Sequence, residues 1–227
     1  YLPHTIYRLD FRRSTMTLPP LEYLLAYWLA STLLAATPGP TWLYALTLNI
    51  SDGWKKSLWI PIGNGLGLLV HLLAALVGLS ILIQQSTVAY EVLRWAGAGY
   101  LCFLAWKILS GKTDLNVDTQ FKRKQTSALK VVMQSALINI TNPKVIIFMI
   151  SFLPQFVRPE AGNFQSQIMI YGLLHIINAG FIICLVVLFS NKMKSLFSGA
   201  GKIAKAFRAT ASMAMVGIAV RVALSDR

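Results

Sequence analysis

Thr37-Pro38-Gly39-Pro40-Thr41 interrupts the first long apolar stretch of the chain, which runs from Leu21 to Leu48. Two prolines and a glycine within five residues disfavour a continuous α-helix, because each proline removes a backbone donor and clashes with the preceding turn. If the stretch crosses a membrane, this break lies near the middle of the bilayer, where unpaired backbone groups are costly. Irregular backbone at that depth is tolerated where it is buried in protein or lines a cavity. The stretch therefore predicts a broken membrane helix beside a binding site.

The composition places the chain among integral membrane proteins. Of its 227 residues, 56% are hydrophobic and 13% are charged, and the mean hydropathy is +0.59. Soluble proteins average about 25% charged residues. The formal charge of +13 would suit a nucleic-acid-binding protein, but the basic residues lie between apolar runs, as the positive-inside rule predicts. We therefore expect the lipid bilayer, and no nucleic acid, as a partner.

Six apolar stretches are expected to be membrane spans, with a polar connection from Gln84 to Glu91. They are Leu21–Leu48, Leu58–Ile83, Val92–Leu109, Val131–Leu153, Ser166–Phe189 and Ala209–Leu224. The hydrophilic stretch from Ser110 to Lys130 divides one domain, residues 16–227, into halves 16–110 and 128–227. Residues 1–15 contain no apolar run, and we expect them to be a non-native or mis-assigned extension.

The distribution of basic residues predicts the orientation of the spans. The connections after the first, third and fifth spans hold most of the Lys and Arg residues, so they are expected to face the cytoplasm. Both termini then lie on the outer side of the membrane. Because each half contains three spans, the two halves must have opposite orientations, which is the inverted-repeat arrangement of several transporters.

Weak internal similarity also favours a repeat. The first spans share a mid-span proline, the second spans share a glycine-led motif, and the third spans end alike. The pairs are Pro38 and Pro143, Gly67-Leu68-Leu69-Val70-His71 and Gly172-Leu173-Leu174-His175, and Ala105-Trp106-Lys107 and Ala219-Val220-Arg221. The expected fold is an all-α integral membrane protein with six transmembrane helices, arranged as two inverted three-helix repeats whose first and fourth helices are broken.

Both breaks have the residues of a helix start. Asn142-Pro143 is typical of an N-cap followed by proline at the first helical position. Thr37-Pro38 fits the same pattern, and Thr41 is a second possible cap after Pro40. Such half-helix N-termini bind anions well, a carboxylate above all. The alternative is a pair of proline kinks that only shape the bundle.

Lys144 follows the second break and is either deep in the membrane, where such residues are functional, or an interfacial lysine. In the first case Gln134, Ser135, Asn139, Thr141 and Asn142 would line a cavity. Asn64 could bind substrate or a carbonyl of the first break. Gly63 and Gly67 form a small-xxx-small pattern that favours close helix packing and allows a homodimer.

His71 and His175 are the histidines inside the spans, and no Asp or Glu lies in a span interior, since Glu22 and Glu91 are at span ends. They are candidate proton carriers, and the alternative is a pair of neutral histidines bonded between helices. Cys102 and Cys184 lie in apolar runs and act as small hydrophobic residues. The sequence has no P-loop, nucleophile elbow or metal-binding cluster, so we expect no cofactor, no metal and no enzymatic activity.

Read together, these residues resemble the lysine exporter (LysE/RhtB) family of bacterial amino-acid exporters, from about Met16 to the end of the chain. The matching motifs are Thr37-Pro38-Gly39-Pro40, Ser51-x-Gly53-Trp54-Lys55-Lys56, Gly63-x-x-x-Gly67 with His71, Gly97-x-Gly99-Tyr100-Leu101, and Asn142-Pro143-Lys144 leading to Phe152-Leu153-Pro154-Gln155-Phe156-Val157. The family often has Asp or Asn after Pro-Gly-Pro, where this chain has Thr41.

The resemblance implies a six-span inner-membrane exporter of amino acids or their derivatives, coupled to protons and working by alternating access. It places Pro38, Gly39, Pro40, Asn142, Pro143 and Lys144 at the functional centre. The candidate substrate-binding residues also include Thr37, Thr41, Asn64 and Asn139. The alternatives are an exporter of another small metabolite and a non-transporting membrane subunit.

Overall fold

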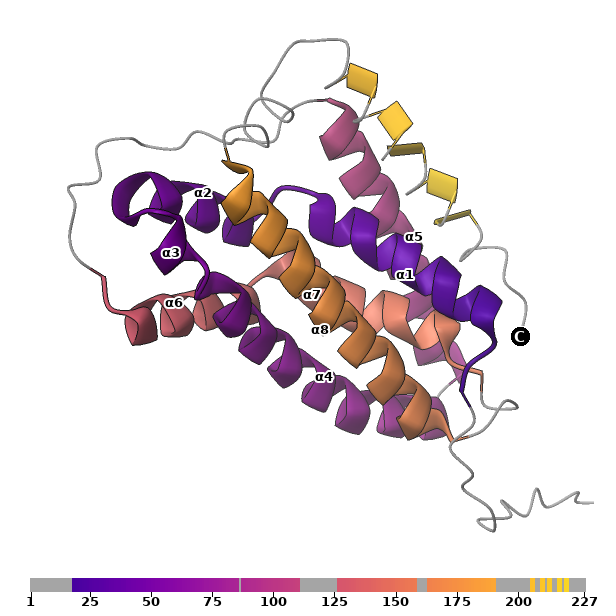
Figure 1. Cartoon of the computed structure of the whole chain (residues 1–227). Helices are drawn as coiled ribbons and strands as arrows, with labels where there is room; N and C mark the ends of the chain where they lie inside the picture. The colour runs from indigo at the N-terminus through magenta and orange to yellow at the C-terminus, as the bar shows by residue number, and fades with distance from the viewer. Residues whose placement is uncertain are drawn as a thin grey trace, which may run out of the picture.

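A computed structural model describes residues 18–85, 87–110, 126–158 and 163–190, together with the pairs 205–206, 209–210, 212–213, 216–217 and 219–220. The expected extension at residues 1–15 and half of the expected sixth span lie outside the described residues. The described part is all-helical and contains no strand (Figure 1), so the all-α prediction is confirmed there.

The elements of the described chain are all helical and follow one another in this order. They are α1 (Leu21–Ala36), α2 (Pro40–Asp52), α3 (Trp54–Ser57), α4 (Ile60–Gln85), α5 (Thr87–Leu109), α6 (Ala128–Ile140), α7 (Pro143–Ile147), the π-helix η1 (Phe148–Phe152), the 3₁₀-helix η2 (Leu153–Phe156) and α8 (Phe164–Leu188).

Two helical segments of the described chain are long and apolar enough to cross a membrane, Trp54–Gly78 and Phe164–Leu188. A third results if Ala128–Ile140 and Pro143–Phe156, which are bent by 55° relative to each other, form one span. Helix α1 is apolar but shorter. These helices support a membrane protein, whereas the arrangement of six spans in two repeats stays a prediction.

The two predicted breaks are present. The first separates α1 from α2 and the second separates α6 from α7. The polar connection predicted from Gln84 to Glu91 is wrong, because α4 continues to Gln85 and α5 begins at Thr87. Without proline or glycine there, polar residues with adequate helix propensity extend both helices.

The polar stretch from Ser51 to Lys56 is also mostly helical. Helix α2 ends at Asp52 and α3 begins at Trp54. Gly53 between them has φ +85°, a left-handed conformation that glycine adopts without steric cost. A single residue therefore turns the chain from one helix into the next.

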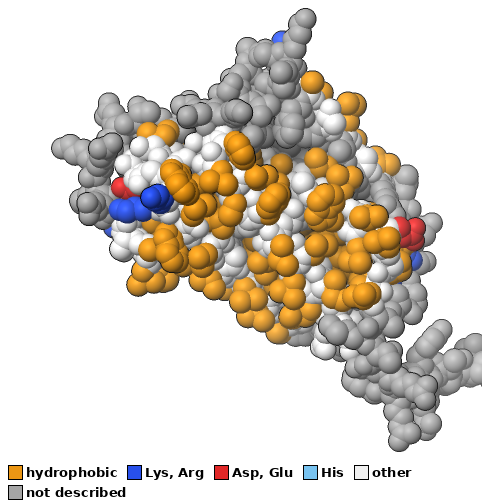
Figure 2. All heavy atoms as spheres, viewed as in Figure 1, with side chains coloured by type: hydrophobic (Ala, Val, Ile, Leu, Met, Phe, Trp, Pro, Cys, Tyr) orange, Lys and Arg blue, Asp and Glu red, His pale blue; other side chains and the backbone are white. Residues whose placement is uncertain are grey.

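Polar and apolar side chains are distributed as expected for a membrane protein. Ser135, Asn139 and His175 are among the buried polar residues, whereas Leu73, Ile177 and Phe181 are among the exposed apolar ones. Figure 2 shows apolar side chains over most of one face. An apolar exterior over an interior that includes polar side chains suits lipid as the surrounding solvent, because lipid does not exclude apolar side chains.

Helices of the first half pack against helices of the second half. Helix α1 of the first half packs against α8 of the second, α6 of the second half packs against α4 of the first, and α4 also meets α8 (Figure 1). Glycines make these approaches close. A Cβ atom at Gly67 would lie 2.7 Å from Asn139 Cβ, and one at Gly172 would lie 2.2 Å from Leu72 Cδ1. The glycine pattern thus serves packing within the chain.

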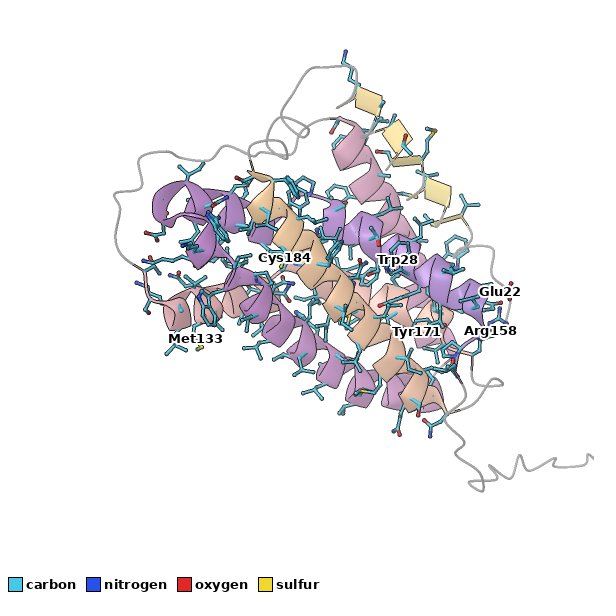
Figure 3. The ribbon with its side chains drawn as sticks, in the orientation of Figure 1. Glu22, Trp28, Met133, Arg158, Tyr171 and Cys184 are labelled. Carbon is cyan, nitrogen blue, oxygen red and sulfur yellow. The ribbon has the colours of Figure 1, made fainter. Side chains whose placement is uncertain are left out.

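An aromatic cluster occupies the other end of the bundle. Tyr27 of α1 lies 4.8 Å from Tyr171 of α8 and 5.2 Å from Phe156, measured between ring centroids. Figure 3 shows Arg158 beside the N-terminal end of α1, where its guanidinium donates to the hydroxyl of Tyr23 and lies over that ring. The cluster connects α1, η2 and α8 away from the helix breaks.

Candidate functional site

The first break is held by hydrogen bonds to the last carbonyls of α1. The last four carbonyls of a helix have no partner within it. Here the backbone N–H of Thr37 donates to the Leu33 and Leu34 carbonyls, each at 3.1 Å, and its hydroxyl donates to Leu33 at 2.8 Å. The indole Nε1 of Trp42 donates to the Ala35 carbonyl at 2.9 Å. The α1 carbonyls at the break are therefore paired by side chains of the break and of α2.

Lys144 of the second break completes this pairing. Its Nζ donates to the carbonyls of Leu34 at 2.9 Å and Thr37 at 2.8 Å. These two residues precede Lys144 by 110 and 107 positions in the chain. The ammonium group of Lys144 therefore lies inside the bundle, beside the first break.

The N-terminus of α2 differs from the prediction. Gly39, not Thr37, is its N-cap, Pro40 is the first helical residue, and no side chain caps this end. Thr37 is the C-cap of α1, and Thr41 lies buried within α2. The prediction failed because Pro38 and Pro40 both fit a first helical position. The structure pairs Pro40, rather than Pro38, with Pro143 as the proline that starts the second half-helix.

The second break matches its prediction. The side chain of Asn142 accepts a hydrogen bond from the backbone N–H of Lys144 at 3.1 Å, and Pro143 is the first residue of α7. Asn142 therefore caps its own helix, as the sequence pattern predicted. The N-terminus of α2 lacks such a cap, so the two breaks are not chemically equivalent.

A small cavity of about 40 Å³ lies between the breaks. It is lined by residues of α1, α2, α4, α6, α7 and α8. Those that the sequence predicted are Gly39, Thr41, Asn64, Asn139, Asn142, Lys144 and His175. Thr37, Pro38, Pro40, Pro143 and His71 are not among the lining residues. The polar side chains that face the cavity thus come equally from the two breaks and from other parts of the helices: Thr41, Asn142 and Lys144 from the breaks, and Asn64, Asn139 and His175 from elsewhere.

Two asparagines connect α4 and α6 at the cavity. The amide Nδ2 of Asn139 donates to Oδ1 of Asn64 at 2.7 Å. His71 Nε2 lies 3.2 Å from the backbone carbonyl of Asn139, so this histidine joins the same two helices. Asn139 Oδ1 is buried and has no hydrogen-bond partner among the described residues. The pair therefore orders the wall of the cavity.

A second polar network connects α1 and α8. Ser31 Oγ lies 2.7 Å from Nδ1 of His175, and Asn178 Nδ2 donates to Ser31 Oγ at 3.0 Å and to Thr32 Oγ1 at 2.9 Å. Because Ser31 accepts from Asn178 and is fully buried, its own proton is best used in a hydrogen bond to His175. The neutral imidazole then carries its proton on Nε2.

Sequence reasoning missed Ser31 and Asn178. Asn178 follows His175 by three positions, so both lie on one face of a helix, and this spacing was a usable signal. Ser31 had no comparable signal. The other predicted cavity residues have structural roles: Ser135 donates to the Ile60 carbonyl, Thr141 bonds its own helix, and exposed Gln134 accepts from Tyr44.

Comparison with known proteins agrees with these features. Residues 32–226 match the family described as LysE type translocator. A homoserine/homoserine lactone efflux protein of Salmonella typhi is 33% identical over 159 residues, 69% of this chain and 74% of that protein. A leucine efflux protein of Klebsiella pneumoniae is 27% identical over 203 residues, 89% and 95% of the two chains. The uncharacterized membrane protein YrhP of Bacillus subtilis is 25% identical over 212 residues, 90% and 100%. No solved structure matches.

Proposed function

Because the chain belongs to the LysE type translocator family, we propose that it exports amino acids or close derivatives across the bacterial inner membrane by secondary active transport. The observation that carries this proposal is the polar cavity between two helix breaks, with the ammonium of Lys144 at its edge. Ionisable groups inside a membrane bundle are expensive and mark substrate pathways.

The substrate carboxylate binds at the N-terminus of α2 in this proposal. That end has no side-chain cap, and helix N-termini carry partial positive charge. Lys144 adds a full positive charge close by, since a Cβ atom at Gly39 would lie 3.6 Å from its Nζ. Thr41, Asn64 and Asn139 supply hydrogen bonds from the cavity wall.

The names of the relatives favour a substrate with a primary amine. Homoserine and leucine have both an ammonium and a carboxylate, whereas homoserine lactone has no free carboxylate. A site that recognised only the carboxylate would reject the lactone. We therefore infer that the ammonium group of the substrate contributes to recognition by this chain.

Transport by alternating access requires the cavity to change size. Small-molecule sites usually have about 300–1,000 Å³, whereas this cavity has about 40 Å³. Substrate entry thus requires the helices to separate. The contacts of α1 with α8 and of α4 with α6 join the two halves of the chain. They support two inverted repeats, residues 16–110 and 128–227, that rock against each other.

Proton coupling is assigned to histidine because no carboxylate is among the residues that line the cavity, and Glu22 lies at the end of its span. His175 lines the cavity and is connected to Ser31, whereas His71 lies behind Asn139. His175 is therefore the stronger candidate. Both termini face the periplasm in this proposal, as the basic connections favour.

Everted membrane vesicles that contain the full chain provide the test. With an acidic interior, they should accumulate labelled L-homoserine or L-leucine faster than vesicles without the chain, and a protonophore should abolish the difference. Lys130→Met, which removes an exposed lysine of α6, serves as the control variant and should transport normally. If vesicles with and without the chain accumulate every amino acid of a broad panel equally, the proposal is wrong.

A further inference from the structure

The C-terminal end of α1 has the chemistry of a cation site. Helix C-termini carry partial negative charge from their unpaired carbonyls. At this end, the carbonyls of Leu34 and Thr37 both accept hydrogen bonds from one primary ammonium, that of Lys144, at 2.9 and 2.8 Å. This ammonium reaches them from another helix of the bundle, so its place is not fixed by the local backbone of α1.

The same break presents an anion site next to this cation site. Helix α2 begins at Pro40, immediately after the break. Its N-cap residue is Gly39, which has no side chain that could bond the first N–H groups of the helix. The Lys144 ammonium lies between the two helix ends, beside Gly39 and against the carbonyls of α1. Two opposed helix ends separated by three residues thus offer carbonyls to a cation and N–H groups to an anion, which matches the two charges of a zwitterion.

We propose that the carbonyls of Leu34 and Thr37 bind the primary ammonium of the transported amino acid, and that Lys144 occupies this position in the present conformation. When the substrate ammonium displaces it, Lys144 moves to the substrate carboxylate. The choice of ligand rests on the proposed export of amino acids, whereas the cation site rests on the two hydrogen bonds alone.

The replacement of the Lys144 ammonium by the substrate ammonium costs little free energy, because every charge keeps a partner. The carbonyls hold one ammonium before and after the exchange, and the displaced ammonium of Lys144 gains a carboxylate partner. Buried charges are tolerated when they are paired and hydrogen-bonded. A cation without a carboxylate would leave Lys144 unpaired, and an anion without an ammonium would leave Lys144 on the carbonyls. The exchange thus selects for molecules that have both groups.

The alternative is that Lys144 only caps α1, as basic side chains near helix C-termini commonly do. The two roles differ in what happens when Lys144 is removed. If Lys144 is only a cap, its removal weakens the binding of all ligands alike or of none. If Lys144 competes with the substrate ammonium, its removal strengthens the binding of ligands that have an ammonium and no carboxylate.

Three probes separate these roles when their binding is measured by thermal stabilisation of the detergent-purified full chain. L-homoserine has both charged groups, N-acetyl-L-homoserine lacks the ammonium, and 3-amino-1-propanol lacks the carboxylate. For the unmodified chain, each incomplete probe should bind about tenfold more weakly than L-homoserine, which is the typical effect of losing one hydrogen-bonded charged group.

The variant Lys144→Met should change the affinities of the two incomplete probes differently. It should bind 3-amino-1-propanol about tenfold more tightly than the unmodified chain does, and bind N-acetyl-L-homoserine no better. The control Lys130→Met should behave like the unmodified chain. Unchanged binding of 3-amino-1-propanol to Lys144→Met would overturn the proposal.

If Lys144→Met does not fold, the unmodified chain decides: equal binding of L-homoserine and its N-acetyl derivative overturns the proposal. Because binding is read without transport, a failure of vesicle export would contradict the proposed function and leave the ammonium site standing. Conversely, normal export together with equal binding of L-homoserine and N-acetyl-L-homoserine would contradict only the ammonium site.

Discussion

Gly63→Ala tests the close contact between α4 and α6, which forms one wall of the cavity. A Cβ atom at position 63 would lie 2.1 Å from the carbonyl oxygen of Val132 and 2.8 Å from Cβ of Ser135. Real Cβ atoms essentially never approach other atoms within 3.0 Å. Because the nearest obstacle is backbone, the two helices must separate by about 1 Å, and such overpacking costs about 1–3 kcal/mol.

Two further effects change the free energy of unfolding of Gly63→Ala. The separation lengthens the hydrogen bond from Ser135 Oγ to the Ile60 carbonyl, now 2.8 Å, which costs about 1 kcal/mol. Replacing a helical glycine by alanine returns about 0.5–1 kcal/mol. The net destabilisation is about 2 kcal/mol, which lowers the unfolding temperature by about 4–8 °C for a chain of this size.

The assay is thermal unfolding of the protein in detergent, with two matched controls on the same helix. A Cβ atom at Gly65 would make an ordinary contact of 3.7 Å with Ile176, and one at Gly78 would meet nothing within 4 Å. Gly65→Ala and Gly78→Ala should therefore be neutral or slightly stabilising. If Gly63→Ala unfolds at the same temperature as these controls, the close contact of α4 with α6 is wrong.

The other predictions concern the polar network, the break and the topology. Ser31→Ala removes the donor to His175 and should slow vesicle export about fivefold, the effect of one net hydrogen bond, whereas Ser31→Thr should retain more activity; equal rates for both variants and the unmodified chain would exclude this role. Trp42→Phe leaves the Ala35 carbonyl without its indole donor and should destabilise the protein by about 1–2 kcal/mol; unfolding of this variant at the unmodified temperature would contradict that hydrogen bond. Reporters fused within the three basic connections should all be active in the cytoplasm, and a periplasmic signal from any of them would contradict the predicted topology; the fusions are placed after Lys56, Lys124 and Lys194.

The sequence predicted the features that depend on local backbone chemistry. Both helix breaks were expected because proline lacks a donor wherever it occurs, and Asn142 was expected as a cap because its side chain reaches an N–H two residues away. The start of α2 was misplaced because Pro38 and Pro40 satisfy the same local rule. Only tertiary packing, with Trp42 bonded back to Ala35, selects between them.

Contacts between distant segments were outside the reach of sequence patterns. The spacing of Gly63 and Gly67 predicted a close helix contact, but not that α6 is the partner. The position of Lys144 after a proline predicted importance, but not the carbonyls that it binds. Ser31 is one of many serines in apolar segments, and its role depends on a histidine 144 residues later.

The bond between Lys144 and the first break also has a consequence for biogenesis. The Thr37 carbonyl enters the membrane 107 residues before its partner Lys144 is synthesised, a delay of about 5–20 s at a translation rate of about 5–20 residues per second. During this interval the insertion machinery, a lipid headgroup or water must solvate the carbonyl, since bare backbone is not tolerated in hydrocarbon. The first half of the chain therefore matures only after the second half arrives, and the ribosome sets the earliest moment at which the finished transporter can assemble.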